Sequence, residues 1–273
     1  MKSAIIFLVL SFTLFSKPYY GVWIRPAEKP EELIKQIQNI KKAGFDAIFL
    51  ETFYHGYVIT PNSVFPHRSY LNGIDLLEIA AKECKKQKLE LHVWLETFYW
   101  RVDTSLAKGF PYSPLLNDSS IAARLKSGEL TGKSEFAHDF VNPLHPKVRC
   151  LLNTYVQQII SRYKIDGIHF DYIRYHAGKE HSGYDSLTLF TFYNDTKIDA
   201  KSIKEDSDEW RVWCLWRENV VTSFLKEISD TIRKVNPKIK ISAAVFGDYY
   251  KARYINSKLQ DWGPGVSLNT SIS

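Results

Sequence analysis

The sequence predicts an α/β protein, an incomplete (β/α)8 TIM barrel with about five βα units. Apolar runs alternate with helical patterns along most of the 273 residues, and strands joined by helical crossovers are parallel. The runs are nearly continuously apolar, as in parallel sheets covered by helices. Each run also ends in an ionisable residue, which favours a barrel, and no glycine-rich phosphate loop follows the first strand as it would in a dinucleotide-binding sheet.

Four helical patterns connect the five expected strands. The strands cover residues 19–26, 46–54, 89–99, 165–175 and 238–250, and the helices lie in residues 29–45, 73–89, 146–164 and 216–235. In the first helix Leu33, Ile37 and Ile40 recur at helical spacing, and Gly44 is placed to end it. Pro146 is expected to begin the third helix, where a missing N–H costs nothing.

The pentapeptide LETFY occurs twice, at residues 50–54 and 95–99, and each copy closes an expected strand. Residues two apart on a strand share a face, so the ionisable strand ends predict one common inward face. That face carries Trp23, Arg25, Phe49, Glu51, His92, Trp94, Glu96, His169, Asp171, Phe246 and Asp248. Burying isolated charges is costly, so five apolar strands that end this way indicate a functional site at the mouth of the barrel rather than packing alone.

The run DGIHFDYIRY, residues 166–175, is the most specific motif of the chain. It resembles the strand-four motif of the glycosyl hydrolase-like 10 family, secreted or envelope-associated TIM-barrel proteins of bacteria. The resemblance extends over residues 21–262, with the phrases GVWIRP, GFDAIFLETFYHGYVITPNSVFP, LELHVWLETFY, FVNPLHPKVR, WRENV, ISAAVFGD and QDW. It implies hydrolysis of O-glycosidic bonds in an extracytoplasmic polysaccharide, with peptidoglycan glycan strands among the candidate substrates.

Glycoside hydrolysis needs a proton donor and a second carboxylate that acts as nucleophile or base. The two lie about 5 to 5.5 Å apart in retaining enzymes and about 6.5 to 9.5 Å apart in inverting enzymes. Asp171 is predicted to be the nucleophile or base, because the nearby Arg174 and His169 favour its ionised form. The sequence leaves open whether the reaction retains or inverts the anomeric configuration.

Glu96 is predicted to be the general acid. It lies between Trp94 and Phe98 in an aromatic setting that could raise the pKa of a carboxyl group and hold a proton. Glu51 competes closely for this role, and Asp248 competes more weakly, because the sequence contains no distances between these groups.

The remaining strand-end residues are predicted to bind the substrate. This set comprises Arg25, Glu51, Tyr54, Trp94, His169, Arg174, Tyr175 and Asp248. Arg25 and Arg174 could instead neutralise buried carboxylates, and both interpretations stay open. Tyr54, Trp100 and Tyr175 are candidate stacking platforms for sugar rings, although aromatic residues at strand ends are as often packing. The long segment 101–142 is interpreted as a wall of the substrate cleft.

No metal or other cofactor is predicted. His92 and His169 are interpreted as interior histidines with hydrogen-bond partners, and the first strand lacks the paired histidines of a metallohydrolase barrel. The three cysteines, Cys84, Cys150 and Cys214, are widely spaced in helical segments, which predicts core thiols rather than disulfides or a metal knuckle.

Residues 1–16 are predicted to be a secretory signal peptide, with Lys2 followed by an apolar stretch at residues 4–15. A buried first element or an uncleaved anchor is the alternative. Residues 17–262 would form the barrel domain and residues 263–273 an irregular tail. The expected location is secreted, periplasmic or at the cell envelope, with no stable membrane span after cleavage. The expected partner is a polysaccharide and not a nucleic acid, since basic stripes are missing from the sequence.

Five strands are fewer than the eight of a closed barrel. In the resembling family QDW is followed by a further helix and three more strands, whereas residues 263–273 show no periodicity. We therefore expect a truncated or frame-disrupted reading of a longer protein that is not a competent enzyme by itself. Unpaired edges of the first and fifth strands would favour self-association. A carbohydrate-binding pseudoenzyme of the same fold is the alternative function.

Overall fold

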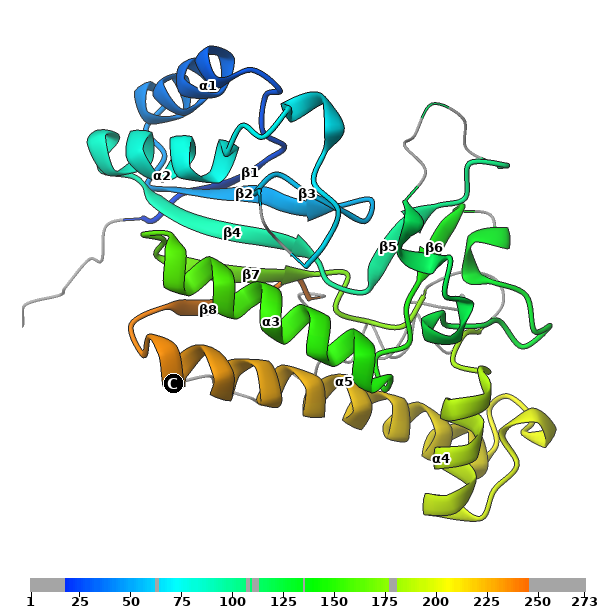
Figure 1. Ribbon diagram of the computed structural model, residues 1–273. Coiled ribbons are helices and arrows are strands. Elements are labelled where there is room, and N and C mark those ends of the chain that lie inside the picture. Colours follow the sequence, from blue (N-terminus) through cyan, green and yellow to red (C-terminus); the bar gives the residue numbers. More distant parts are fainter. Residues whose placement is uncertain are drawn as a thin grey trace, which may run out of the picture.

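The protein is described by a computed structural model over residues 18–245, apart from residues 62–63, 107–108, 110–112, 135 and 177–180. Its main sheet contains five parallel strands (Figure 1). In spatial order they are β1 (Gly21–Ile24), β2 (Ala47–Tyr54), β4 (Glu90–Glu96), β7 (Gly167–Asp171) and β8 (Lys240–Ala243). A short strand, β3 (Tyr57–Val58), pairs antiparallel with β2. The α/β class and the five expected parallel strands are confirmed.

The four expected helices are α1 (Pro30–Lys42), α2 (Leu76–Gln87), α3 (Pro146–Arg162) and α5 (Asp208–Val235). Gly44 follows α1 with a φ of +87°, a conformation that glycine adopts without strain. Asp75 caps α2, because its carboxylate accepts a hydrogen bond from the N–H of Glu78 at 3.0 Å. Short 3-10 turns are η1 (Ser69–Leu71), η2 (Pro114–Leu116), η3 (Ser119–Ile121), η4 (Thr131–Lys133) and η5 (Ala200–Ser202).

Helix α4 (Ser186–Thr196) and the first turns of α5 were not predicted. The α4 sequence is rich in aromatic residues, but Phe190 is 68% exposed and Tyr193 is also exposed. Phe192 alone of its aromatic side chains is fully buried, against Trp213 of α5. Apolar residues therefore occur all round α4, and the periodicity that marks a helix with one buried face is missing.

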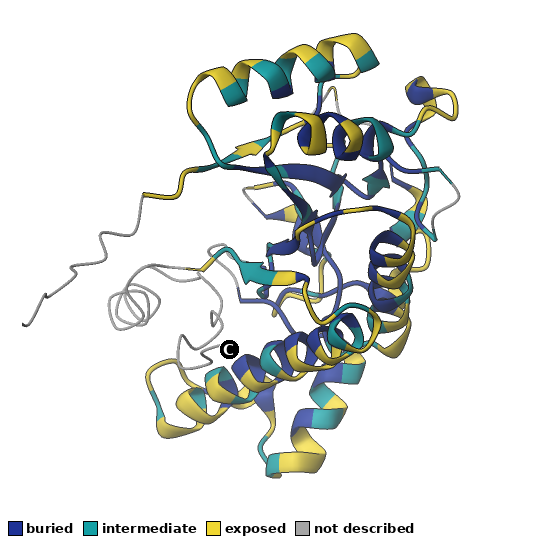
Figure 2. Cartoon of the chain, turned by 90° about the vertical axis from the view of Figure 1, so that its left-hand side faces the viewer, coloured by how far each residue is buried: buried dark blue, intermediate teal, exposed yellow. Residues whose placement is uncertain are grey.

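Helices α1, α2, α3 and α5 cover one face of the sheet, and the largest hydrophobic core lies between these helices and the strands (Figures 1 and 2). The strand residues of this core include Ile48, Leu50, Leu91, Val93, Leu95, Ile168 and Phe170, and they pack with helix residues that include Leu33, Ile37, Leu77, Val156 and Ile159. Fully burying one such side chain stabilises the fold by roughly 1.5–3 kcal/mol. Residues that alternate with these strand positions face the other side, here called the inner face.

Glu90 ties distant strands together at the amino end of the inner face. Lys240 of β8 donates to both carboxylate oxygens of Glu90, at 2.6 and 2.8 Å, and the Tyr19 hydroxyl, just before β1, donates to the same group. His92 Nε2 lies 3.2 Å from Glu90 Oε2. The first and last strands of the sheet therefore meet at one carboxylate, which curls the sheet about its inner face.

A small second sheet lies beyond the carboxyl ends of the parallel strands (Figure 1). It pairs β5 (Tyr99–Val102) with β6 (His138–Phe140) in antiparallel fashion. Arg101 and Asp139 connect the two strands through a hydrogen bond of 2.7 Å, and the N–H of Gly132 donates to Asp139 at 2.8 Å. The described part of segment 101–142, interpreted as a cleft wall, thus lies beyond the carboxyl ends of the parallel strands, on the predicted side.

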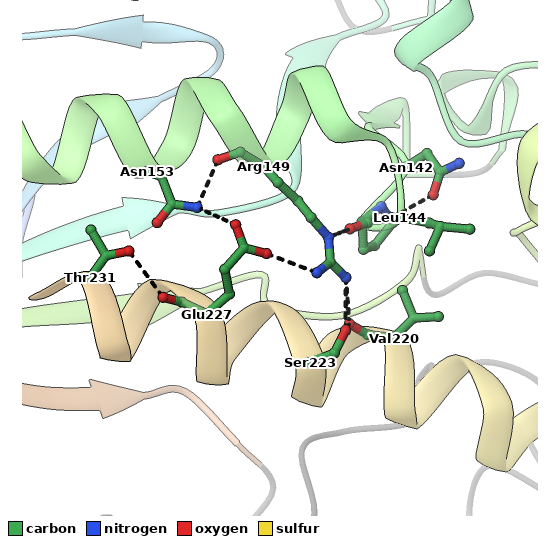
Figure 3. Close-up of polar contacts among 9 residues, drawn as sticks. Asn142, Leu144, Arg149, Asn153, Val220, Ser223, Glu227 and Thr231 are labelled. Atoms are coloured by element: carbon green, nitrogen blue, oxygen red, sulfur yellow. Dashed lines mark hydrogen bonds and ion pairs between the residues drawn. The ribbon is translucent and has the colours of Figure 1, made fainter.

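Helices α3 and α5 run side by side and are joined by Arg149 (Figure 3). Its guanidinium donates to Glu227 Oε2 at 3.0 Å, to Ser223 Oγ at 2.9 Å and to the carbonyls of Pro143 and Val220 at 2.8 and 3.0 Å. Asn153 donates to the other oxygen of Glu227 at 2.9 Å. One α3 side chain therefore satisfies acceptors on α5 and in the loop before α3.

Several predictions fall on residues outside the described part of the chain: the signal peptide, Phe246, Asp248 and the tail 263–273. The core-thiol prediction is wrong for two cysteines, because Cys84 is buried whereas Cys150 is exposed and Cys214 is half-buried. Both lie on helix faces that turn partly toward solvent. No helix within the described ranges is both long and apolar enough to cross a membrane.

Replacing Arg149 with Met should destabilise the fold by roughly 2–3 kcal/mol. The four hydrogen bonds of the charged guanidinium are lost, and the carbonyl of the buried Pro143 loses this donor. Urea denaturation of the two proteins measures this difference in the free energy of unfolding. The matched control is Lys226→Met, which removes an exposed pair with Asp230 on the same helix α5 and should change stability little. Equal effects of the two substitutions would contradict the role of Arg149.

The Glu90 contacts predict a loss of stability in acid. Burial alone would raise the pKa of Glu90, but the hydrogen bonds from Lys240, Tyr19 and His92 outweigh burial and lower the pKa to about 2. A carboxyl with a depressed pKa stabilises the fold fully above its ordinary pKa of about 4.3 and loses this effect as the pH falls toward 2.

We expect the stability difference between the wild type and Glu90→Gln to shrink as the pH falls from about 5 to about 2.5. Chemical denaturation at a series of pH values measures it. A difference that stays constant over this range would show that Glu90 is not held ionised by these contacts.

Candidate active site

Glu51, Glu96 and Asp171 lie together on the inner face. Glu96 and Asp171 end β4 and β7, and Glu51 lies three residues before the end of β2. The register pairs Glu96 with Asp171 directly, and Glu51 lies opposite Trp94, two residues before Glu96. Glu51 is 1% exposed and Glu96 is 3% exposed, whereas the Asp171 side chain is 19% exposed. The alternation argument is confirmed, because neighbouring strands deliver these three carboxyl groups to one edge of the sheet.

Glu51 is held from the end of β1 by an ion pair. Arg25 Nε lies 2.5 Å from Glu51 Oε2, and the same guanidinium lies 4.6 Å from the centre of the Tyr54 ring. The carboxyl groups of Glu51 and Glu96 are hydrogen-bonded to each other. Burial raises the pKa of Glu51, and Arg25 opposes this effect.

Glu96 is the most strongly perturbed carboxyl of the site. Burial raises its pKa well above the usual value, the charges of Glu51 and Asp171 raise it further, and the His55 N–H and Arg25 oppose the rise. The backbone N–H of His55 donates to Glu96 Oε2 at 2.6 Å. A hydrogen bond between two carboxyl groups requires one proton. The Arg25 guanidinium contacts Glu51, which favours Glu51 as the carboxylate and Glu96 as the protonated partner.

Asp171 accepts hydrogen bonds at both oxygens. Trp94 Nε1 donates to Oδ2 at 3.2 Å, and the backbone N–H of Tyr172 donates to Oδ1 at 2.7 Å. Arg174 Nη1 lies 3.8 Å from Oδ1 and its guanidinium lies over the Tyr172 ring at 4.5 Å. The carboxylate is therefore fixed in orientation and partly open to solvent, as a group that meets a substrate must be.

Two backbone donors of the site come from residues in the left-handed region. His55 has a φ of +52° directly after β2, and Tyr172 has a φ of +48° directly after β7. Non-glycine residues adopt such angles at a cost, and such strain clusters at functional sites. Gly56 follows with a φ of +77°, and a side chain there would collide with the Trp100 carbonyl. Each turn aims one N–H at one carboxyl group.

The β5–β6 sheet contributes an aromatic border. The Tyr99 ring lies 4.3 Å from the His138 ring, 5.2 Å from the Tyr172 ring and 5.8 Å from the His55 ring. Burial and then Arg174 lower the pKa of His138 to about 4, and burial followed by Arg25 and Arg68 lowers that of His55 to about 3. Both imidazoles are therefore neutral at neutral pH.

The sequence did not predict His55, Arg68, Tyr99, His138 or Tyr172 as site residues. The His-Gly pair after the first LETFY is a signal for a turn with positive φ. The sequence around Tyr172 contains no such turn signal. Tyr172 contributes to the site through its backbone N–H, which the identity of its side chain does not reveal.

The interior histidines lie one layer below the carboxyl groups. His169 Nε2 accepts from Trp23 Nε1 at 3.1 Å, and His169 Nδ1 lies 2.9 Å from Ser242 Oγ. Burial lowers the pKa of His169 to about 4. His169 is thus a satisfied interior residue, as predicted, and does not contact Asp171 directly. His92 differs, because its Nδ1 has no hydrogen-bond partner in the described part of the chain.

Three aromatic residues proposed as stacking platforms are buried instead. Tyr54, Trp100 and Tyr175 are each less than 5% exposed. The Arg68 guanidinium lies 3.4 Å from the Tyr54 ring centre, and Trp100 Nε1 donates to the Thr97 carbonyl at 2.8 Å. Direct stacking on a sugar ring does not fit these positions, because neighbouring side chains already cover the rings.

Metal binding finds no support among the residues that the structure describes, where no group of three His, Cys, Asp or Glu side chains could hold an ion. The chemistry on offer is that of carboxyl groups: a buried neutral acid, Glu96, next to an oriented carboxylate, Asp171.

Known proteins resemble this chain in sequence over most of its length. Glycosyl hydrolase YngK of Bacillus subtilis is 22% identical over 240 residues, covering 82% of this chain and 41% of that protein. Glycosyl hydrolase DigH of Escherichia coli K12 is 20% identical over 232 residues, covering 82% of this chain and 49% of that protein. The chain spans about half the length of these curated relatives.

Solved structures share the fold. Alpha-L-fucosidase isoenzyme 2 from Paenibacillus thiaminolyticus matches with a TM-score of 0.61 at 12% identity, over 84% of this chain and 33% of that one. Such a likeness shows a common TIM-barrel architecture, of which the five parallel strands form part. The family model described as Glycosyl hydrolase-like 10 matches residues 16–267, and the chain belongs to that family.

Proposed function

We propose that this site hydrolyses O-glycosidic bonds, with Glu96 as general acid and Asp171 as nucleophile or general base. The observation that carries the proposal is the direct pairing of these two residues on β4 and β7, one buried and the other partly open. A carboxyl group kept neutral beside an oriented carboxylate is the arrangement that glycoside hydrolysis requires.

In the first step the Glu96 O–H bond breaks and its proton passes to the glycosidic oxygen. The bond from that oxygen to the anomeric carbon breaks at the same time, and its electron pair goes to the departing oxygen. Asp171 either bonds to the anomeric carbon or removes a proton from the water that does so. In the first case a water molecule then hydrolyses the glycosyl–enzyme bond and returns a proton to Glu96.

Neighbouring groups suit these roles. Trp94 and the Tyr172 N–H orient Asp171, which lowers the entropy cost of reaching an attacking geometry. The Tyr99 and Tyr172 rings border the carboxyl groups, and a dry environment strengthens electrostatic interactions with developing charge. Arg174 faces the same carboxylate.

The substrate we propose is an extracytoplasmic polysaccharide, with peptidoglycan glycan strands as the first to test. Support comes from family membership and from the apolar stretch at residues 4–15, which is typical of exported proteins. The net charge of +6 suits an anionic cell-wall polymer. We propose a secreted, periplasmic or envelope location on the same grounds.

In a full-length version with a complete barrel, Asp171→Asn and Glu96→Gln should each lower hydrolysis of the glycan by roughly 10²–10⁴-fold. Each substitution removes a group that exchanges a proton or forms a bond in the transition state. Release of reducing ends from purified glycan strands measures the rate. Asp230→Asn on the outer surface of α5 is the matched carboxyl-to-amide control and should retain full activity.

Undiminished turnover by Asp171→Asn would remove Asp171 from the mechanism. Saturable glycan binding by the wild type with no release of reducing ends would instead favour the carbohydrate-binding pseudoenzyme.

A further inference from the structure

We propose that Arg25 and Glu51 are positioning residues that keep the transferable proton on Glu96: Arg25 fixes Glu51 as a carboxylate, and Glu51 accepts the hydrogen bond of the Glu96 O–H. The inference rests on the proposed function only for its consequence in catalysis. It assigns to Glu51 a role other than that of a competing acid.

The geometry makes a relay of three groups from three neighbouring strands. Arg25 follows β1 and contacts Glu51 Oε2 at 2.5 Å, and Glu51 is hydrogen-bonded to Glu96 of β4. Arg25 is half-exposed, while Glu51 and Glu96 are buried. Burial lowers the pKa of Arg25, but the hydrogen bond and the charge of Glu51 outweigh burial, so Arg25 keeps its charge. The cation thus contacts the first carboxyl of the pair, and its charge also favours the ionised form of the second.

Only one proton is needed for the two carboxyl groups, and the surroundings decide where it resides. Arg25 and Arg68 both favour the ionised form of Glu51. Glu96 receives one backbone hydrogen bond, from His55, which favours its ionised form, but burial and the neighbouring charge of Glu51 act more strongly in the opposite direction. A carboxylate at Glu51 therefore makes Glu96 the neutral member of the pair.

Every element packed around Glu96 contributes to this balance. The charged or titratable groups are Arg25 after β1, Glu51 and Tyr54 on β2, His55 in the following turn, Arg68 after β3, Tyr99 on β5, His138 on β6, and Asp171 and Tyr172 at the end of β7. His55 and His138 are neutral at neutral pH because burial lowers their pKa. The charged neighbours of Glu96 are thus two cations, Arg25 and Arg68, and two carboxylates, Glu51 and Asp171.

The relay has a consequence for the reaction. Glu96 must hold its proton before bond cleavage and must release it during cleavage. When the proton leaves, the new Glu96 carboxylate is stabilised by the His55 N–H and by Arg25, both of which favour its charged form. Glu51 stays ionised throughout, so the proton that the leaving oxygen gains comes from Glu96 and is restored from water in the second step.

The His55 amide provides a direct readout of the Glu96 titration, because its N–H donates to Glu96 Oε2 at 2.6 Å. We would follow its ¹H and ¹⁵N chemical shifts against pH in the full 273-residue chain. The wild type should titrate with a midpoint above the ordinary glutamate value of about 4.3. The well-dispersed spectrum of each variant also reports that it is folded.

Glu51→Gln should lower this midpoint by about one to three pH units, because it removes a negative charge next to Glu96. Arg25→Gln should move the midpoint upward, because it removes the positive charge that opposes protonation of the pair. Arg25→Lys keeps the charge and should stay near the wild type. Lys29→Gln, which removes an exposed cation near the start of α1, should leave the midpoint unchanged. If Glu51→Gln fails to fold, the two Arg25 variants decide.

Opposite shifts in Glu51→Gln and Arg25→Gln support the relay, whereas an unmoved midpoint or shifts in the same direction overturn it. Activity is scored separately. A general acid works only while protonated, so the loss of rate at high pH should move down in Glu51→Gln and up in Arg25→Gln. If the amide midpoints shift as expected but a full-length version with a complete barrel releases no reducing ends, the proposed hydrolysis is wrong and the relay stands. If glycan is hydrolysed but the amide midpoints do not shift, the proposed hydrolysis stands and the relay is wrong.

Discussion

The alternation of side chains along parallel strands is the constraint on which the rest of this structure depends. On one side of the sheet the strand residues pack against the helices and are therefore apolar, as Leu50, Val93 and Phe170 are. The inner face does not pack against these helices, so it can carry histidines, two tryptophans and carboxyl groups. Because parallel strands all run in one direction, their last inner positions lie at one edge, and Glu96 and Asp171 become neighbours there.

Features that depend on local pattern could be predicted from the sequence. The spacing of Leu33 and Ile37 and the position of Gly44 determine a helix and its end within a few residues, whatever lies elsewhere in the chain. The common face of Glu51 and Glu96 follows from a period of two and from the repeated strand end, so it too needed no knowledge of distant contacts.

Features that depend on distant neighbours could not be predicted. Tyr54 is covered because Arg68 folds back over its ring, and Cys150 is exposed because of where α3 meets α5. The turn at Tyr172 left no trace in the sequence, since a tyrosine disfavours positive φ and only the surrounding structure imposes it. Ion pairs such as the one between Arg25 and Glu51 were foreseen as an alternative, but their geometry required the register of the strands.

The two strained turns after β2 and β7 have a consequence for sequence variation in this site. Glu96 and Asp171 are oriented by main-chain amides at positions 55 and 172. Every amino acid except proline possesses such an N–H. Drift at these two positions can therefore exchange one side chain for another while the donors persist, with glycine and asparagine the easiest replacements for the backbone. Among related proteins the residue type at these two positions would then say little about the site, whereas the conformation of the turn would be retained.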